Sequence, residues 1–397
     1  MADSRGMGEC PAVGNPLYLD HASTAPPLQE ALDAFAKASV SAFGNPGSAH
    51  QAGAKAARVL ERSRKELKTA FGAEDFRVVW TASGTESNHL AIQGLAKKAP
   101  KGVDRILFGA AEHPSARMAA LALANQGLTV EELPVDGAGI LQPETLEAAL
   151  GEDVALVTVH WANNELGTLN PIAQLVTLTR HLAPRAFFHT DAVQAVGKRP
   201  ETLDSLGVDS AAVAGHKIGG VRGCAALLLA SRSAEPEPMF LGGGQEGGLR
   251  SGTENVMGAA AFAAAATVRR AHLGEDPRVY LDRRRKLLDH LREAAPEMVV
   301  LGSEEESEIV GSILTVAFPG TRAVNLLHHM EAEGVQVGSG SACNTDSPTI
   351  SRVLVAAGVP EELALATLRF SLGGMETDED LARAASALEK ARASLAV

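Results

Sequence analysis

The sequence predicts an α/β fold in which a mostly parallel sheet carries helices on both faces. From about residue 75, short apolar segments alternate with helical patterns. These segments are apolar on both faces, as strands buried in a parallel sheet are. Such alternation is typical of a sheet covered by helices on either side. The length of 397 residues allows two or three domains.

The expected strands of this sheet are bounded by Gly, Pro or polar residues and lie at 77–80, 105–108, 154–159, 186–189, 210–214 and 225–229. The expected helices between them lie at 84–97, 115–126, 143–150 and 172–181. After about residue 258 the pattern changes, with helices at 258–272, 277–294, 322–334 and 378–393 and strands at 313–317 and 367–372. We therefore expect a large α/β domain over residues 17–258. Residues 259–397, together with 1–16, form a smaller α+β domain in this interpretation.

The composition excludes several classes of function. With 36 Lys and Arg against 48 Asp and Glu, the formal charge is −12, which disfavours nucleic acid and anionic membranes as partners. The run 283–285 of three arginines is interpreted as the solvated face of a helix. The apolar run 257–268 is too short to cross a bilayer. Three scattered cysteines predict neither disulfides nor a metal site, so we expect a cytoplasmic protein.

Polar residues follow the expected strands, at the edge where open α/β sheets bind ligands. The hydroxyl-rich turn 81–88 leads into a helix, so it is either a phosphate site or a simple capping turn. His113 follows the next strand, and Asn164 the one after; either residue can equally be structural. Asp191 ends a very apolar strand, where a carboxylate needs a cationic partner. Lys217 follows another strand and is either a surface charge or a Schiff-base former.

Together these residues match the needs of pyridoxal 5′-phosphate. Lys217 would bond to the cofactor aldehyde, and Asp191 would pair with the pyridinium nitrogen and make the ring an electron sink. The turn at Gly84 and Thr85 would bind the phosphate, and His113 would cover the ring.

A series of motifs in fixed order also carries a family resemblance: YLDHAST, GNPGSAH, TASGTESNHLAI, AEHPS, ANNELGT, FHTDAVQAVGK, AGHKIGG, GGGQEGGLRSGTENV, GSGSACN and LRFSLGG. In these the chain resembles the NifS/IscS-like cysteine desulfurases. They are class V, fold-type I pyridoxal-phosphate enzymes with a large α/β domain and a smaller α+β domain. The resemblance covers nearly the whole chain from Tyr18.

The resemblance implies roles around the cofactor ring. Lys217 would hold the cofactor and move protons, while His113 would stack on the ring and Asp191 would pair with its nitrogen. Gln194 would hydrogen-bond the phenolic oxygen, and Asn164 would lie beside that oxygen and the substrate.

It also implies roles for residues at the phosphate and the substrate. Thr85 and His216 would bind the phosphate, although Ala214 stands where the family usually has a serine. Thr253 would reach the phosphate of a partner subunit, which implies a homodimer. Arg369, with Asn164, would hold the substrate carboxylate.

Cys343 lies among small polar residues, as expected for an exposed loop. In the family this cysteine attacks the substrate sulfur. Cys224 lies in an apolar segment and is expected in the core, and no role is expected for Cys10.

The sequence thus predicts a homodimeric L-cysteine desulfurase that passes a Cys343 persulfide to an acceptor, such as an iron–sulfur scaffold or a tRNA-thiolation protein. The alternatives are a selenocysteine lyase or other C–S lyase, a class V aminotransferase, and a non-catalytic scaffold protein.

Overall fold

The structure is a computed structural model of the chain and describes residues 16–339 and 350–395. Its larger sheet has seven strands in the order β2-β8-β7-β6-β5-β3-β4. The strands from β7 to β4 run parallel, whereas β8 is antiparallel to both its neighbours. The strands are β2 (Phe76–Thr81), β3 (Arg105–Gly109), β4 (Thr129–Leu133), β5 (Val154–Thr158), β6 (Phe187–Asp191), β7 (Ser210–Ala214) and β8 (Ala225–Ala230).

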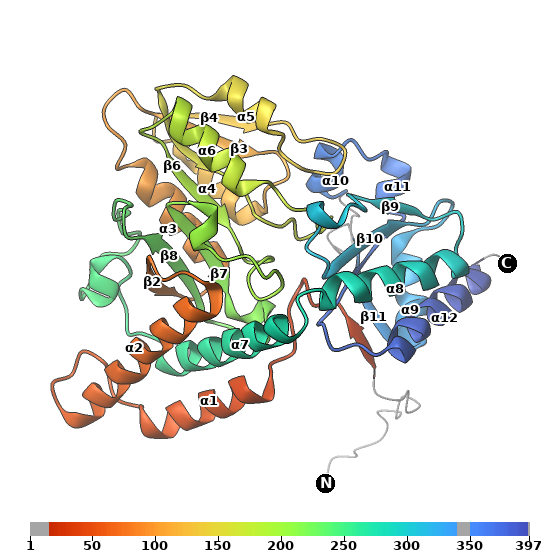
Figure 1. Ribbon diagram of the computed structural model, residues 1–397, viewed down its shortest axis with the longest axis horizontal. Coiled ribbons are helices and arrows are strands. Elements are labelled where there is room, and N and C mark those ends of the chain that lie inside the picture. The colour runs from red at the N-terminus through yellow and green to blue at the C-terminus, as the bar shows by residue number, and fades with distance from the viewer. Residues whose placement is uncertain (1–15, 340–349, 396–397) are drawn as a thin grey trace, which may run out of the picture.

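Side chains of this sheet alternate between two cores, one on each face. In β8, Leu228 lies in one core and Leu227 in the other. Helices α3 and α4 cover the Leu227 face, and the remaining helices of this half cover the other face (Figure 1). These helices are α1 (Gln29–Ser41), α2 (Gln51–Phe71), α3 (Gly84–Ala96), α4 (Pro114–Ala124), α5 (Pro143–Ala149), α6 (Ile172–Leu182) and α7 (Val256–Glu275).

A smaller sheet of five strands lies beside the first, in the order β1-β11-β12-β10-β9 (Figure 1). It consists of β1 (Leu17–Leu19), β9 (Val299–Leu301), β10 (Ile313–Ala317), β11 (Val335–Ser339) and β12 (Thr367–Ser371). Side chains of these strands share one core with α8 and α12, around Phe370 and Leu388. The helices of this part are α8 (Val279–Ala294), α9 (Ala323–Ala332), α10 (Arg352–Ala356), α11 (Glu361–Leu365) and α12 (Asp378–Leu395).

The predicted α/β class and parallel-rich sheet are confirmed, and the expected elements lie within a few residues of their predicted bounds. The interpretation of residues 283–285 is wrong for Arg284, which is buried and donates to the carbonyl oxygens of Ile313 and Ser303. The long arginine side chain reaches carbonyl oxygens of other segments, and the helical pattern of the sequence does not reveal these acceptors. The domain division near residue 258 stays a prediction, and β1 pairs with β11 of the smaller sheet.

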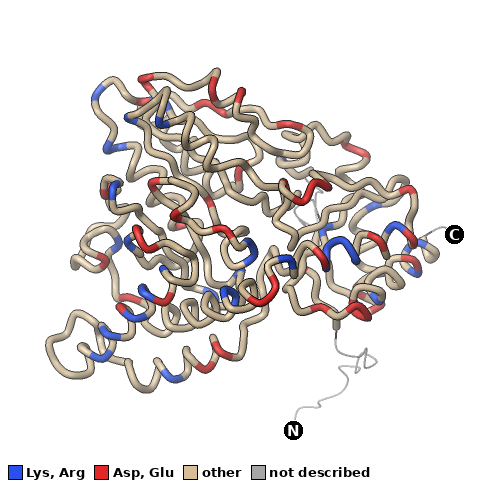
Figure 2. Tube along the Cα trace, viewed as in Figure 1, with Lys and Arg blue, Asp and Glu red and all other residues tan. Residues whose placement is uncertain are grey.

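Charged residues of both signs are interspersed along the described chain (Figure 2). Among the described residues, no helix has the length and apolar composition that crossing a membrane requires. The same part of the chain contains no group of three or more His, Cys, Asp or Glu arranged to hold a metal ion.

Candidate active site

A cavity of about 250 Å³ lies beyond the carboxyl ends of β5, β6 and β7, where the topology predicts a ligand site. Its lining residues are Ser83, Gly84, Thr85, His113, Ser115, His160, Ala162, Asn164, Asp191, Val193, Gln194, Ala214, His216 and Lys217. A larger groove of about 820 Å³ lies between α9, α11 and α12, but it contains none of the expected site residues. The smaller cavity is therefore the candidate active site.

Lys217 ends the short 3-10 turn that follows β7. Its Nζ donates hydrogen bonds of 2.7 Å to the carbonyl oxygens of Ala22 and Ser23. Burial, followed by the positive charge of Arg369, lowers the pKa of Lys217 from 10.5 to about 8. A nucleophilic lysine needs neutral amine, and this shift increases the neutral fraction at physiological pH.

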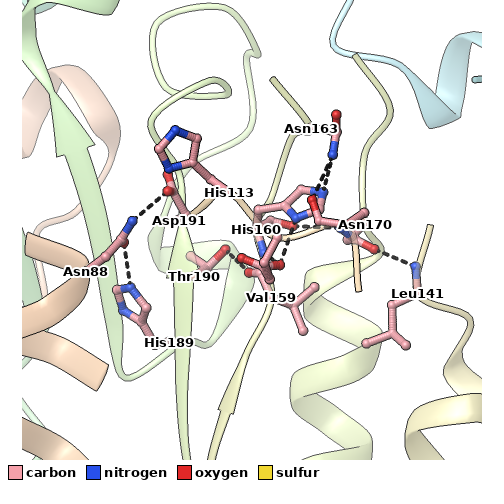
Figure 3. Close-up of polar contacts among 12 residues, drawn as sticks. Asn88, His113, Leu141, Val159, His160, Asn163, Asn170, His189, Thr190 and Asp191 are labelled. Carbon is pink, nitrogen blue, oxygen red and sulfur yellow. Dashed lines mark hydrogen bonds and ion pairs between the residues drawn. The ribbon is translucent and has the colours of Figure 1, made fainter. Parts of the chain in front are cut away.

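Asp191 is the last residue of β6 and is held by neutral donors (Figure 3). Its Oδ2 accepts from Asn88 Nδ2 at 2.7 Å, and its Oδ1 accepts from the Val193 backbone nitrogen at 3.0 Å. The sequence led us to expect a cation beside this buried carboxylate, but its hydrogen-bonding partners are an amide side chain and a backbone N–H. A positively charged ring nitrogen in the cavity would therefore give this buried carboxylate a cationic hydrogen-bonding partner.

Asn88 connects Asp191 to a buried histidine, a link that the sequence analysis did not identify (Figure 3). Asn88 Oδ1 lies 3.0 Å from His189 Nε2, and Ser210 Oγ lies 2.8 Å from His189 Nδ1. Burial lowers the pKa of His189 to about 4, so its ring is neutral at physiological pH. Asn88 Oδ1 can only accept, so the ring proton is on Nε2. This contact fixes the orientation in which Asn88 donates to Asp191.

His113 caps the N-terminus of α4 and lines the cavity. Its Nδ1 accepts from the Ser115 backbone nitrogen at 3.1 Å and lies 2.7 Å from Ser115 Oγ. Burial lowers the pKa of His113, so a neutral ring with its proton on Nε2 faces the cavity. A neutral, fixed ring suits stacking on an aromatic ligand.

The hydroxyl-rich turn places the N-terminus of α3 at the cavity. Ser83 Oγ caps α3 by accepting from the Glu86 backbone nitrogen at 3.2 Å. A Cβ on Gly84 would lie 3.0 Å from Val193 Cγ2, so this position leaves little room for a side chain. Thr85 also lines the cavity. Backbone N–H groups and the helix dipole make this turn suitable for a phosphate.

His216 and Ala214 also line the cavity, and Ala214 Cβ would lie 3.7 Å from a Cβ on Gly84. Burial and the charge of Lys217 lower the pKa of His216 to about 4, and its Nδ1 lies 3.1 Å from Thr24 Oγ1. Ala214 lacks the hydroxyl expected from the resemblance, so His216 and the α3 turn remain as candidate phosphate ligands.

Arg369 lies beside the cavity, in contact with the segment that follows β1. Its Nη2 donates to Asp20 Oδ1 at 2.7 Å and to Ser23 Oγ at 2.8 Å, and its Nη1 donates to the Asn164 carbonyl oxygen at 3.0 Å. Its Nε is buried and has no hydrogen-bond partner among the described residues. Because Ala22 O also accepts from Gln194 Nε2 at 2.9 Å, this segment contacts the expected lysine, glutamine and arginine together.

The structure does not bring Thr253 to this cavity; the residue is exposed on the loop before α7. This loop is anchored by Glu246, whose carboxylate forms two hydrogen bonds with the Arg64 guanidinium, of 2.9 and 2.7 Å. Glu246 also accepts from the Trp80 backbone nitrogen at 3.0 Å and has a φ of 52°, which is unusual for a residue other than glycine. The contacts with Arg64 and Trp80 hold Glu246 in this strained backbone conformation, so they fix the conformation of the loop.

The cysteines differ in what the structure describes. Cys343 and Cys10 lie outside the described residues. Cys224 is 2% exposed, which confirms the prediction that it is a core residue, and burial raises the pKa of its thiol to about 12. Cys224 is therefore inert as a nucleophile at physiological pH.

A buried His160–Glu112 pair in the cavity wall also escaped the sequence analysis. Glu112 Oε1 accepts from the His160 backbone nitrogen at 2.6 Å and contacts its Nδ1 at 2.7 Å. Burial acts to lower the pKa of His160, but the charge and hydrogen bond of Glu112, together with the charge of Asp191, raise it. The motif AEHPS contains Glu112, which follows β3. Only the fold shows that its partner His160 follows β5, the strand paired with β3.

This set of residues fits pyridoxal 5′-phosphate. A lysine with a lowered pKa, a buried carboxylate, a neutral ring and a helix N-terminus line one cavity. A Cβ at Gly84 would crowd Val193, so glycine suits this position at the start of α3. Fold and site together define the class of pyridoxal-phosphate proteins built on a parallel-rich sheet.

Comparison with known proteins agrees with this class. The family model "Aminotransferase class-V", a pyridoxal-phosphate-dependent family, matches residues 17–383. The chain belongs to this family, and curated relatives that match nearly its whole length are named cysteine desulfurases. A cysteine desulfurase IscS from Methanosarcina thermophila is 34% identical over 367 residues, covering 92% of this chain and 89% of the relative. One from Dictyoglomus turgidum is 34% identical over 377 residues, covering 94% of each chain.

Solved structures give the same result. A NifS-like protein superposes with a TM-score of 0.87 at 28% identity, covering 96% of this chain and 100% of that one. A NifS-like protein from Rickettsia africae gives 0.83 at 29% identity with the same coverage. The structure of SspA in complex with cysteine gives 0.77 at 27% identity, covering 91% of this chain and 100% of that one.

Proposed function

We propose that the chain is a pyridoxal-phosphate-dependent L-cysteine desulfurase that forms L-alanine and a persulfide on Cys343. The observation that carries this proposal is the meeting of Lys217, Asp191 and His113 in one cavity of a chain whose relatives are cysteine desulfurases. In this proposal Lys217 bonds to the cofactor and later moves the Cα proton. Bound cofactor supplies an electron sink that stabilises negative charge on the substrate.

Arg369 is proposed to bind the substrate carboxylate together with Asn164. Its guanidinium already contacts Asp20, so an incoming carboxylate would find a preoriented cationic partner.

The sulfur step is proposed for Cys343 as thiolate. It attacks the substrate Sγ, the Cβ–Sγ bond breaks, and Cβ keeps the electron pair and takes a proton. Alanine and the persulfide balance without an external oxidant or reductant. A reducing cytoplasm, the compartment we propose, keeps this thiol free.

The test uses purified protein with pyridoxal phosphate and L-cysteine, with alanine and sulfide measured in the presence and absence of a thiol reductant. We expect alanine from the wild type and reductant-dependent sulfide, both lost in Cys343→Ser. Cys10→Ser is the matched control and should behave as wild type. Wild-type alanine formation by Cys343→Ser would refute the role of Cys343. Faster turnover of selenocysteine, or amino transfer to a keto acid, would favour the alternative reactions on the same site.

The chain is also proposed to act as a homodimer in which Thr253 binds the phosphate in the partner subunit. Large apolar side chains are exposed on and after α1 and on the loop before the glycine-rich segment, among them Val40 at 80% and Leu241 at 88%. Exposed apolar side chains of this size favour an interface. Light scattering should give twice the mass of the chain, 41.2 kDa, and Leu241→Asp should shift the protein toward the monomer. A monomer that binds the cofactor fully would refute this part.

A further inference from the structure

Lys198 is a buried lysine that the proposed function does not use. It is 4% exposed and follows Gly197, which has a φ of 71°. A Cβ on Gly197 would lie 3.2 Å from Ile218 Cγ2 and 3.3 Å from Arg269 Cβ. Glycine therefore lets this turn pack against its neighbours, and the turn directs Lys198 toward the interior.

The hydrogen bonds of Gln194 connect Lys198 to the cavity. Lys198 Nζ donates to Gln194 Oε1 at 2.7 Å, and Gln194 Nε2 donates to Ala22 O at 2.9 Å. An ammonium can only donate and a carbonyl can only accept, so these two partners fix the orientation of the amide. Gln194 lines the cavity, and the second hydrogen on its Nε2 is available to an acceptor there.

The charges around Lys198 are positive. Lys217 follows β7, Arg269 lies in α7 and Arg369 in β12; burial and these three cations lower its pKa well below 10.5. His21, from the segment after β1, and His216, before Lys217, also feel its charge. Among the residues the structure describes, no carboxylate forms an ion pair with it. A buried cation without a counter-charge is unfavourable, and an anion bound beside Gln194 would supply one.

We propose that Lys198 is a positioning residue for the oxyanion that Gln194 binds, the phenolic oxygen of pyridoxal phosphate. This inference rests on the proposed function. Lys198 holds the Gln194 oxygen, so the amide N–H stays directed at the cavity. The phenolic oxyanion in turn stabilises the charged form of Lys198. Both effects favour the ionised phenolic oxygen and lower the pKa of the bound chromophore.

The test is a pH titration of the visible absorption of the cofactor-loaded protein. Lys198→Met keeps the length of the side chain but leaves Gln194 Oε1 without its donor. We expect the apparent pKa of the bound chromophore to rise by about one unit. Gln194→Leu should give a similar rise, and adding Lys198→Met to Gln194→Leu should add little. The exposed Lys97→Met is the matched control and should leave the titration unchanged.

An unchanged titration in Lys198→Met would overturn the inference and leave the proposed function intact. Fully additive shifts would also overturn it, because Lys198 would then act independently of Gln194. A wild-type chain that forms no visible band with pyridoxal phosphate would contradict both proposals. Gln194→Glu provides a second measurement that leaves Lys198 in place. It keeps an oxygen acceptor for Lys198 but removes the N–H that faces the cavity, so the chromophore pKa should rise. An unchanged chromophore pKa in this variant would contradict the role of the Gln194 N–H.

Discussion

The pKa of Lys217, about 8, predicts how fast the cofactor-free protein condenses with pyridoxal phosphate at each pH. At pH 7 about a tenth of Lys217 is neutral, whereas a lysine with a pKa of 10.5 is neutral in about one molecule in 3000. The structure therefore gives about 300 times more reactive amine than an exposed lysine would have. The rate of condensation should rise about tenfold per pH unit up to pH 8 and then level off.

The assay is stopped-flow absorbance with excess cofactor, and Lys217→Arg serves as the control without the signal. Arg369→Met tests the origin of the shift. Burial is the larger cause of the lowered pKa and Arg369 the second. The pH at which the rate levels off should therefore rise in this variant but stay below 10.5. A rate that keeps rising tenfold per unit through pH 10 in the wild type would refute the reasoning.

Three further predictions concern the residues around the site. Glu246→Gln removes the buried charge that pairs with Arg64, so the free energy of unfolding in urea should fall by about 3 kcal/mol. Glu61 is an exposed carboxylate that pairs with the same arginine, so Glu61→Gln should lower the free energy of unfolding by less than about 1 kcal/mol. Equal losses would contradict this difference. His189 has a folded pKa of about 4, below the unfolded 6.5, so the unfolded state binds more protons and stability should fall as pH falls from 6.5 to 4. Thermal scans check this, and His189→Asn should flatten the profile. Asn88→Ala removes a donor from Asp191, and equilibrium dialysis should show cofactor affinity reduced about tenfold; unchanged affinity would show that Val193 suffices.

The buried strands of the large sheet were predictable because both of their faces are apolar. Strand β4 was missed, since Thr129–Leu133 contains two glutamates and lies at the sheet edge, where one side remains polar. Helix α2 was missed although Leu60 and Leu67 recur at helical spacing on its buried face.

The candidate site was predictable to the extent that each residue follows a strand. Its supporting contacts were not predictable, because Asn88 meets Asp191 across 103 positions of sequence. The contact between Gln194 and Lys198 spans only four positions, but it depends on the turn at Gly197. Spacing alone does not show which way such a turn directs its side chain.

The segment after β1 has a consequence for the order in which the protein matures. Its carbonyl oxygens at Ala22 and Ser23 hold Lys217, and β1 pairs with β11 near the other end of the chain. Asp20 also bridges to Arg369 and Ser371. During synthesis, the contacts that surround Lys217 therefore cannot all form until β12, which carries Arg369, has left the ribosome. Cofactor capture in its final geometry is consequently a late event, after synthesis is nearly complete.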